Sequence, residues 1–168
     1  MVKIAPRHVF VSVGRTGSPG QAEFARAVES FLRERGYIPR TVGRTDFSYE
    51  KPLKKIAQVM GECSGTIVIA LERFHIDRGA EFRDSEGKIE LENVNLPTVW
   101  NQIEATMAYM LGQPLLAIVN ANLRSDGLLE TGYDWYVKWV DMDPASLSSP
   151  DFLRIFKDWE KQVAEYRR

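Results

Sequence analysis

The chain has 168 residues, of which 44% are hydrophobic and 11% aromatic, enough to build one domain with a full core. Its 22 basic and 23 acidic residues nearly cancel, so we expect neither nucleic acid nor a membrane as a partner. The single cysteine, Cys63, excludes an internal disulfide, and with His8 and His75 it gives no zinc-ligand spacing, so we expect no metal. The sequence shows no apolar signal core and no apolar run of about 18 residues, which favours a cytoplasmic protein.

The first half of the chain alternates apolar strands with amphipathic helices. His8 to Val13 is rich in β-branched and aromatic residues, which is typical of a buried strand. A helix follows, with Ser18 as its N-cap, Pro19 in its first turn, Gln21 completing a capping box and Gly36 at its end. The same patterns predict a strand over 37–42, whose Pro39 suits a sheet edge, a helix over 52–63 and a strand over 66–71.

The second half continues the alternation after a charged stretch. Residues 72–96 are charged and contain two glycines, and we expect a long loop there that orders or covers a site. The remaining patterns predict a helix over 99–111 ended by Gly112, a strand over 114–119, a loop over 120–134, an edge strand over 135–140, and a helix over 150–166 capped by Ser149-Pro150.

This alternation predicts a single α/β domain over 1–168, with its core at about 8–140. The strand over 66–71 is apolar without alternation, so both of its faces are covered, as in a parallel sheet between two helix layers. We therefore predict a flavodoxin-like three-layer sandwich with a mainly parallel five-stranded sheet in the order 2-1-3-4-5. Ligands bind such sheets at the carboxyl ends of the strands, where the winding direction reverses. That rule brings together residues 12–16, residues 72–74 and the start of the helix over 99–111.

Glu104 is the first functional candidate because it falls on an apolar stripe of its helix. Trp100, Ala108 and Leu111 share this stripe, and burying an unpaired carboxylate among them is costly. Two interpretations are open. With Asn101 as the N-cap, Glu104 is only the third residue of a capping box. With Thr98 as the N-cap, Glu104 lies well inside the helix, and a functional role is favoured.

The turn after the first strand is the second candidate. Ser12, Gly14, Arg15 and Thr16 offer hydroxyls, backbone amides and a guanidinium beside a helix N-terminus, which suits a ribose or a phosphate. The turn lacks the Gly-Lys-Ser/Thr of a Walker loop and the pattern Gly-x-Gly-x-x-Gly. An ordinary strand-to-helix turn explains it equally well.

Three motifs resemble families that cleave N-glycosidic bonds. Thr98-x-Trp100-x-x-x-Glu104 resembles the Ser-x-Trp-x-x-x-Glu motif of TIR domains that cleave NAD, and the strand from His8 to Ser12 resembles their Phe-Ile-Ser strand. The run from Glu104 to Pro114 resembles a signature of nucleoside 2-deoxyribosyltransferases. The chain departs from the TIR pattern in having Thr98 in place of the serine and no Arg-Asp...Pro-Gly loop over 43–52. It departs from the transferase pattern in having Gln113 in place of the lysine and no carboxylate over 93–103.

The resemblance implies an enzyme of the NAD glycohydrolase or ADP-ribosyl cyclase type, in which Glu104 stabilises or traps an oxocarbenium ion during cleavage of the N-glycosidic bond of NAD. Nicotinamide leaves a cationic precursor without needing a proton, so one carboxylate suffices and NAD is favoured as substrate, with no cofactor. Ser12, Arg15 and Asn101 then orient ribose or phosphates, and Trp100 and Phe74 line the nicotinamide pocket.

Two alternatives are open at this point. The first is a nucleoside or nucleotide N-glycosidase or 2-deoxyribosyltransferase. The second is a nonenzymatic nucleotide-binding or TIR-type signalling module. The resemblance also implies a homo-oligomer and, in a bacterium, a role in antiphage defence.

Overall fold

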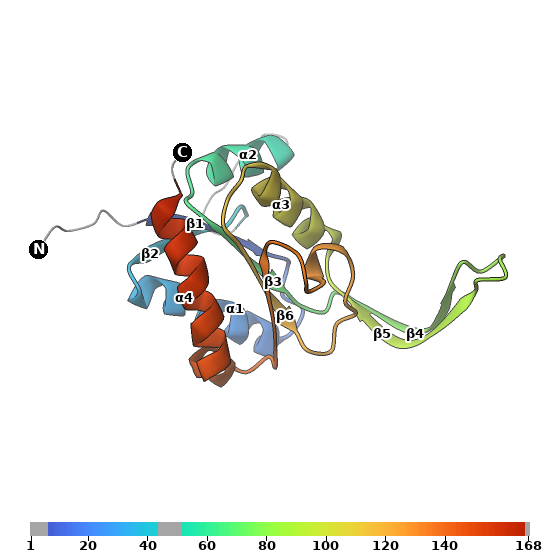
Figure 1. The fold of residues 1–168 in the computed structure, drawn as a ribbon. Coiled ribbons are helices and arrows are strands. Elements are labelled where there is room, and N and C mark those ends of the chain that lie inside the picture. The colour runs from blue at the N-terminus through green and yellow to red at the C-terminus, as the bar shows by residue number, and fades with distance from the viewer. Residues whose placement is uncertain (1–6, 44–51, 167–168) are drawn as a thin grey trace, which may run out of the picture.

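The structure, a computed structural model, describes residues 7–43 and 52–166. Within these ranges a central sheet is flanked by helices on both faces (Figure 1). The sheet contains β1 (Arg7–Val13), β2 (Tyr37–Arg40), β3 (Thr66–Ala70), β6 (Leu115–Asn120) and β7 (Tyr136–Val140). The helices are α1 (Pro19–Glu34), α2 (Pro52–Gly61), α3 (Val99–Met110) and α4 (Pro150–Glu165), with short 3-10 turns at Gly127–Leu129 and Pro144–Ser148.

The sheet has the strand order β2-β1-β3-β6-β7, and every neighbouring pair in it is parallel. The strands β4 and β5 form a separate sheet, so the five central strands, counted along the chain, follow the predicted order 2-1-3-4-5. The predicted flavodoxin-like class is confirmed. The strand with Pro39 and the last strand lie at the two edges, as their sequences predict.

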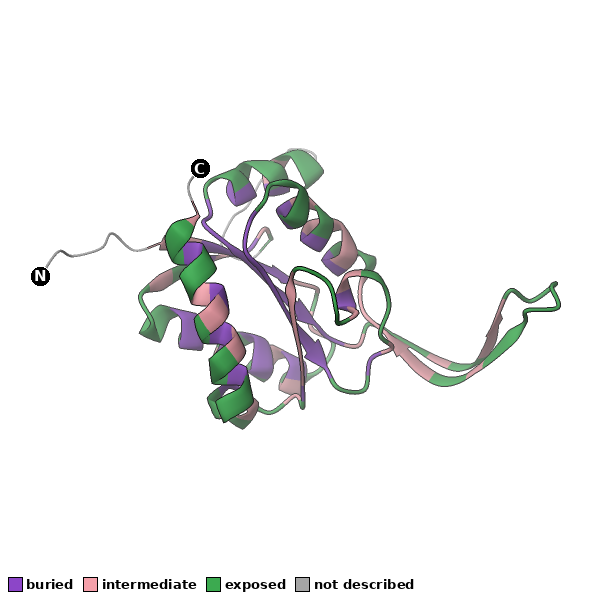
Figure 2. Cartoon of the chain, viewed as in Figure 1, coloured by how far each residue is buried: buried purple, intermediate pink, exposed green. Residues whose placement is uncertain are grey.

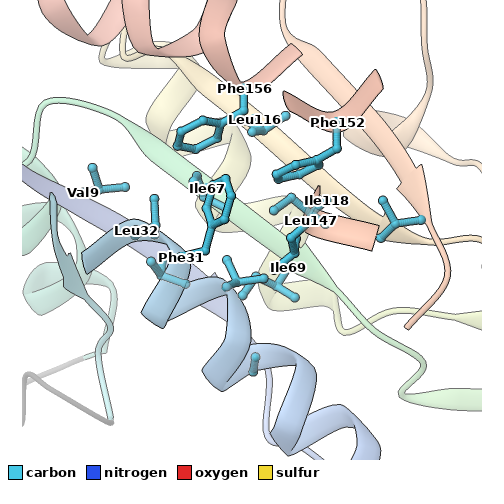
Figure 3. Packing of buried hydrophobic residues seen from close by; sticks show 14 of the residues in the cluster. Val9, Phe31, Leu32, Ile67, Ile69, Leu116, Ile118, Leu147, Phe152 and Phe156 are labelled. Atoms are coloured by element: carbon cyan, nitrogen blue, oxygen red, sulfur yellow. The ribbon is translucent and has the colours of Figure 1, made fainter. Parts of the chain in front are cut away.

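Alternation along the strands divides the core into two layers. Val9 and Val11 of β1 face α1 and α4, whereas Phe10 faces α2 and α3. Between the sheet and α1 and α4, the ring of Phe31 meets Phe152 and Phe156 at centroid distances of 5.4 and 4.8 Å (Figure 3). Figure 2 shows the buried central strands between helices whose outer surfaces are exposed.

The helix boundaries largely follow the predicted capping residues. The Ser18 hydroxyl accepts a hydrogen bond from the Gln21 backbone N–H at 3.2 Å, and Gly36, at φ +82°, follows the end of α1. The Gln21 side chain does not close a capping box onto Ser18. Its Oε1 instead accepts the Gly17 N–H at 2.7 Å, and its Nε2 donates to the Glu72 carbonyl at 2.8 Å.

The prediction of a loop over 72–96 is wrong. These residues form an antiparallel hairpin, β4 (Phe74–Glu81) and β5 (Ile89–Leu96), which projects from the body of the domain (Figure 1). No residue of either strand is fully buried. A strand that packs neither face on a core needs no apolar side, so the charged composition of this segment resembles that of a loop.

Gln113 fixes the end of the sheet opposite to the carboxyl ends of the strands. Its buried side chain accepts from the Thr66 hydroxyl at 2.8 Å and donates to the carbonyls of Met60 and Cys63 at 2.7 and 3.0 Å. One amide thus ties together the start of β3, the end of α2 and the approach to β6. At the position of the transferase lysine, this chain carries a residue that stabilises the fold.

Candidate active site

A cleft of about 340 Å³ lies at the carboxyl ends of β1, β2 and β3. The turn after β1 and the first turns of α3 contribute to its walls, as do α2 and the segments after β2 and β3. Its lining residues are Val13, Gly14, Arg15, Val42, Ile56, Arg73, Thr98, Trp100 and Glu104. The position is the switch point at which ligands bind open α/β sheets.

Glu104 lies in this cleft on the second turn of α3. Thr98 is the N-cap of the helix, and its hydroxyl accepts the Trp100 N–H at 3.4 Å. The alternative in which Asn101 is the N-cap is therefore wrong, because Asn101 is inside the helix and only 1% exposed. Glu104 is partly buried, and its burial raises the pKa of the carboxyl to about 7, against a smaller lowering by a hydrogen bond with Ser12.

A buried chain of hydrogen bonds orients the Glu104 carboxyl. Ser12 follows Phe10 in the alternation of β1, so its hydroxyl faces α3. Asn101 Nδ2 donates to Ser12 Oγ at 3.0 Å, which leaves the hydroxyl hydrogen for the Glu104 carboxylate. Asn101 Oδ1 is buried and has no hydrogen-bond partner among the described residues, and Asn101 lines a small recess beside the cleft.

Two guanidinium groups give the cleft a local positive charge. Arg15 and Arg73 both line it, and both also line a small recess beside it together with Asn101. Within residues 7–43 and 52–166 neither arginine forms a salt bridge. Free guanidinium groups in a cleft are suited to phosphate oxygens.

The structure brings most of the predicted site residues together. Gly14, Arg15, Trp100 and Glu104 line the cleft, with Ser12 and Asn101 directly behind Glu104. Gly14 permits this approach, since a Cβ there would lie 2.9 Å from the Thr98 methyl carbon. Two predicted residues lie elsewhere.

Thr16 and Phe74 are the predicted residues that do not line the cleft. Phe74 is 53% exposed at the start of the hairpin, so its neighbour Arg73 takes the position at the cleft. Sequence analysis missed Arg73 and also Gln21, which holds the turn after β1 and the segment after β3 together. The available signal was that residues 72–74 follow the central strand.

No group of three or more His, Cys, Asp or Glu side chains in the described part of the chain is arranged to hold a metal ion. No helix within residues 7–43 and 52–166 is long and apolar enough to cross a membrane.

Comparison with known proteins adds a relation of fold. No protein-family model and no curated protein matches the chain. The structure is similar to the CMP N-glycosidase BcmB of Clostridium botulinum, with a TM-score of 0.51 and 11% identity over 89% of this chain and 99% of that one. The chain shares its fold with a nucleotide N-glycosidase. A second solved structure, the TIR domains of the activated Roq1 resistosome that recognises the effector XopQ, gives a TM-score of 0.43 and 12% identity over 96% of this chain and 75% of that one.

Proposed function

We propose that this protein cleaves the N-glycosidic bond of a phosphate-bearing nucleotide, with NAD as the first candidate substrate. The observation that carries the proposal is the partly buried Glu104 carboxyl, which faces a cleft and is hydrogen bonded to Ser12. A carboxylate held in such a place suits a reaction that develops positive charge on a ribose. The shared fold of the CMP N-glycosidase supports this class of chemistry.

The chemistry follows from the charges. As the bond from C1′ of the ribose to the nicotinamide nitrogen breaks, its electron pair leaves with nicotinamide, which becomes neutral. The ionised Glu104 either stabilises the oxocarbenium ion or traps it as a glycosyl ester. Water then adds to C1′, breaking the bond to the Glu104 oxygen where the ester has formed, and its proton passes to solvent. Because the substrate ring is cationic, its binding favours the ionised form of Glu104.

The other groups in the cleft have roles that fit a nucleotide. Arg15 and Arg73 would bind phosphate oxygens, which a plain nucleoside lacks. The Asn101 amide oxygen would accept a ribose hydroxyl, and Trp100, which is 44% exposed, offers a ring face to the base. The two arginines therefore favour a nucleotide over a nucleoside.

A nucleotide with a neutral base is the second candidate, and the pKa of Glu104 supports it. At a pKa of about 7, part of the Glu104 population is protonated near neutral pH and can donate a proton to a departing base. The two candidates have opposite pH profiles. The rate rises with pH through about 7 if Glu104 acts ionised, and it falls if Glu104 acts as an acid.

Release of free base from NAD, CMP and matched nucleosides, measured by chromatography, tests the proposal. We expect release from phosphate-bearing substrates and a loss of about 100-fold or more in Glu104→Gln. A nonenzymatic nucleotide-binding or signalling module would bind without consuming its ligand and would be unaffected by this substitution. We also propose that the protein acts as a homo-oligomer, so the assay includes protein concentrations at which light scattering detects association.

A further inference from the structure

A second cavity, of about 370 Å³, lies at the opposite end of the sheet from Glu104. It is bounded by the last turns of α3 and α4 and by the residues that lead into β6 and β7. Since the sheet is parallel, this end is formed by the amino ends of the strands, far from the cleft. The residues that define its chemistry are Tyr109, Asp134, Trp135, Glu165 and Tyr166.

Three aromatic rings in this cavity are held in place by the protein itself. The rings of Tyr109 and Trp135 have centroids 5.5 Å apart and planes inclined at 75°, so they form two walls of a corner. Trp135 Nε1 donates to the Leu128 carbonyl at 3.0 Å, and Tyr133 stacks on the indole at 4.6 Å. The Tyr166 hydroxyl donates to the carbonyl of Leu111, the C-cap of α3, at 3.2 Å. The aromatic surface is therefore preorganised.

The charged side chains that the structure describes around these rings are acidic. Asp134 and Glu165 line the cavity, whereas no described lysine, arginine or histidine does. The Tyr109 hydroxyl donates to Asp134 at 3.2 Å, and the Asp134 charge raises the pKa of Tyr109, so the phenol stays neutral. Lys161 interacts electrostatically with Glu165, but its ammonium donates a hydrogen bond to Asp158 at 2.9 Å and does not line the cavity.

The helix termini reinforce this field. The C-terminal ends of α3, at Met110, and of α4, at Glu165, both border the cavity, and a helix C-terminus carries a partial negative charge. Neither the last turn of α3 nor that of α4 contains a basic residue that would compensate this partial negative charge. The described residues therefore offer a cation two carboxylates and two helix C-termini, whereas a neutral ligand would desolvate the carboxylates without pairing them.

We propose that this cavity binds a small organic cation of the alkylammonium class. The face of an aromatic ring attracts such a cation, and the two carboxylates add Coulomb attraction and accept hydrogen bonds from any N–H groups. This site is separate from the cleft, and the inference goes beyond the proposed cleavage reaction. Its failure would leave the assignment of Glu104 untouched.

The test compares two probes that differ only in charge, choline and its uncharged isostere 3,3-dimethyl-1-butanol. Each is titrated into the full chain, and binding is followed by NMR at the indole N–H signal of Trp135. We expect a saturable shift with choline and at least about ten-fold weaker binding of the alcohol. Equal responses to the two probes, or no saturable response to choline, would overturn the proposal.

Two variants and a control locate the binding. Tyr109→Leu removes a ring, and Asp134→Asn removes a charge from an exposed side chain whose loss does not threaten the fold. We expect each to weaken choline binding by about five-fold or more. The control, Phe82→Leu, makes the same kind of change at an exposed ring on the hairpin and should bind choline as the wild type does. Unchanged binding by Asp134→Asn and Tyr109→Leu would contradict the assignment.

Discussion

Replacing Glu104 by glutamine should stabilise the folded protein at high pH and remove most of the proposed base-release activity. Glutamine has nearly the same shape and can still accept a hydrogen bond from Ser12, but it cannot ionise. In the wild type, burial raises the Glu104 pKa from 4.5 to about 7. The folded state therefore binds more protons than the unfolded state between these values, and the free energy of unfolding falls as pH rises through them.

The size of the effect follows from that difference. Each pH unit corresponds to about 1.4 kcal/mol, which for a rise from 4.5 to about 7 gives an upper limit of about 3.5 kcal/mol above pH 7. Partial solvent exposure of the carboxyl reduces this to about 2 kcal/mol, or an increase of about 4 to 8 °C in Tm for a domain of this size. At about pH 4.5 most of the penalty is absent, because Glu104 is protonated in the folded state and about half protonated in the unfolded state.

Urea unfolding of wild type and Glu104→Gln at about pH 4.5 and about pH 8.5 measures this difference. The exposed glutamate of α1, Glu23, supplies a matched control, and Glu23→Gln should show no such pH-dependent gain. A stability difference between Glu104→Gln and wild type that stays constant with pH would refute the reasoning, since it would mean that the carboxylate is ionised at no cost.

Three further predictions follow from particular contacts. Ser12→Ala removes the hydrogen bond that lowers the Glu104 pKa, so the midpoint of the pH–rate profile should move up by about one pH unit. An unchanged profile would contradict the role given to Ser12. Arg73→Ala should raise KM for a phosphate-bearing substrate about ten-fold or more in steady-state kinetics, whereas Arg78→Ala on the hairpin should not. Replacing residues 77–93 by an Asn-Gly turn keeps Asn95, whose carbonyl accepts the Arg124 N–H, and should change Tm in calorimetry by less than about 3 °C, because no residue of either hairpin strand is fully buried. A much larger loss would show that the removed part of the hairpin supports the core.

Much of the fold is predictable because burial leaves a periodic pattern in the sequence. The apolar run of β3 has to be covered on both faces, and the capping residues Ser18, Thr98 and Ser149 each precede a helix. The hairpin is not predictable in this way. Its strands pack neither face against a core, so no one-sided apolar pattern distinguishes them from a charged loop.

The same reasoning separates the predictable part of the site from the rest. The sequence draws attention to Glu104 because its helix is apolar, but the stripe that it shares with Trp100 and Leu111 does not face the core. These two side chains are 44% and 46% exposed, and the buried residues of α3 are Asn101, Ala105 and Ala108. The meeting of Glu104 with Ser12 follows from the alternation of β1. Whether Arg73 or Phe74 lines the cleft depends on the direction in which the chain leaves β3. Sequence reasoning had no way to know that direction, because it follows from the hairpin.

Base release from NAD by wild type and Glu104→Gln is the most direct test of the central claim. The two proteins are compared across a range of concentrations that includes assembled states, with CMP and unphosphorylated nucleosides as parallel substrates. The account predicts release of nicotinamide or another base from a phosphate-bearing substrate by the wild type and a loss of about 100-fold or more in Glu104→Gln. Retention of activity in Glu104→Gln, or no base release from any substrate by assembled wild type, would contradict it.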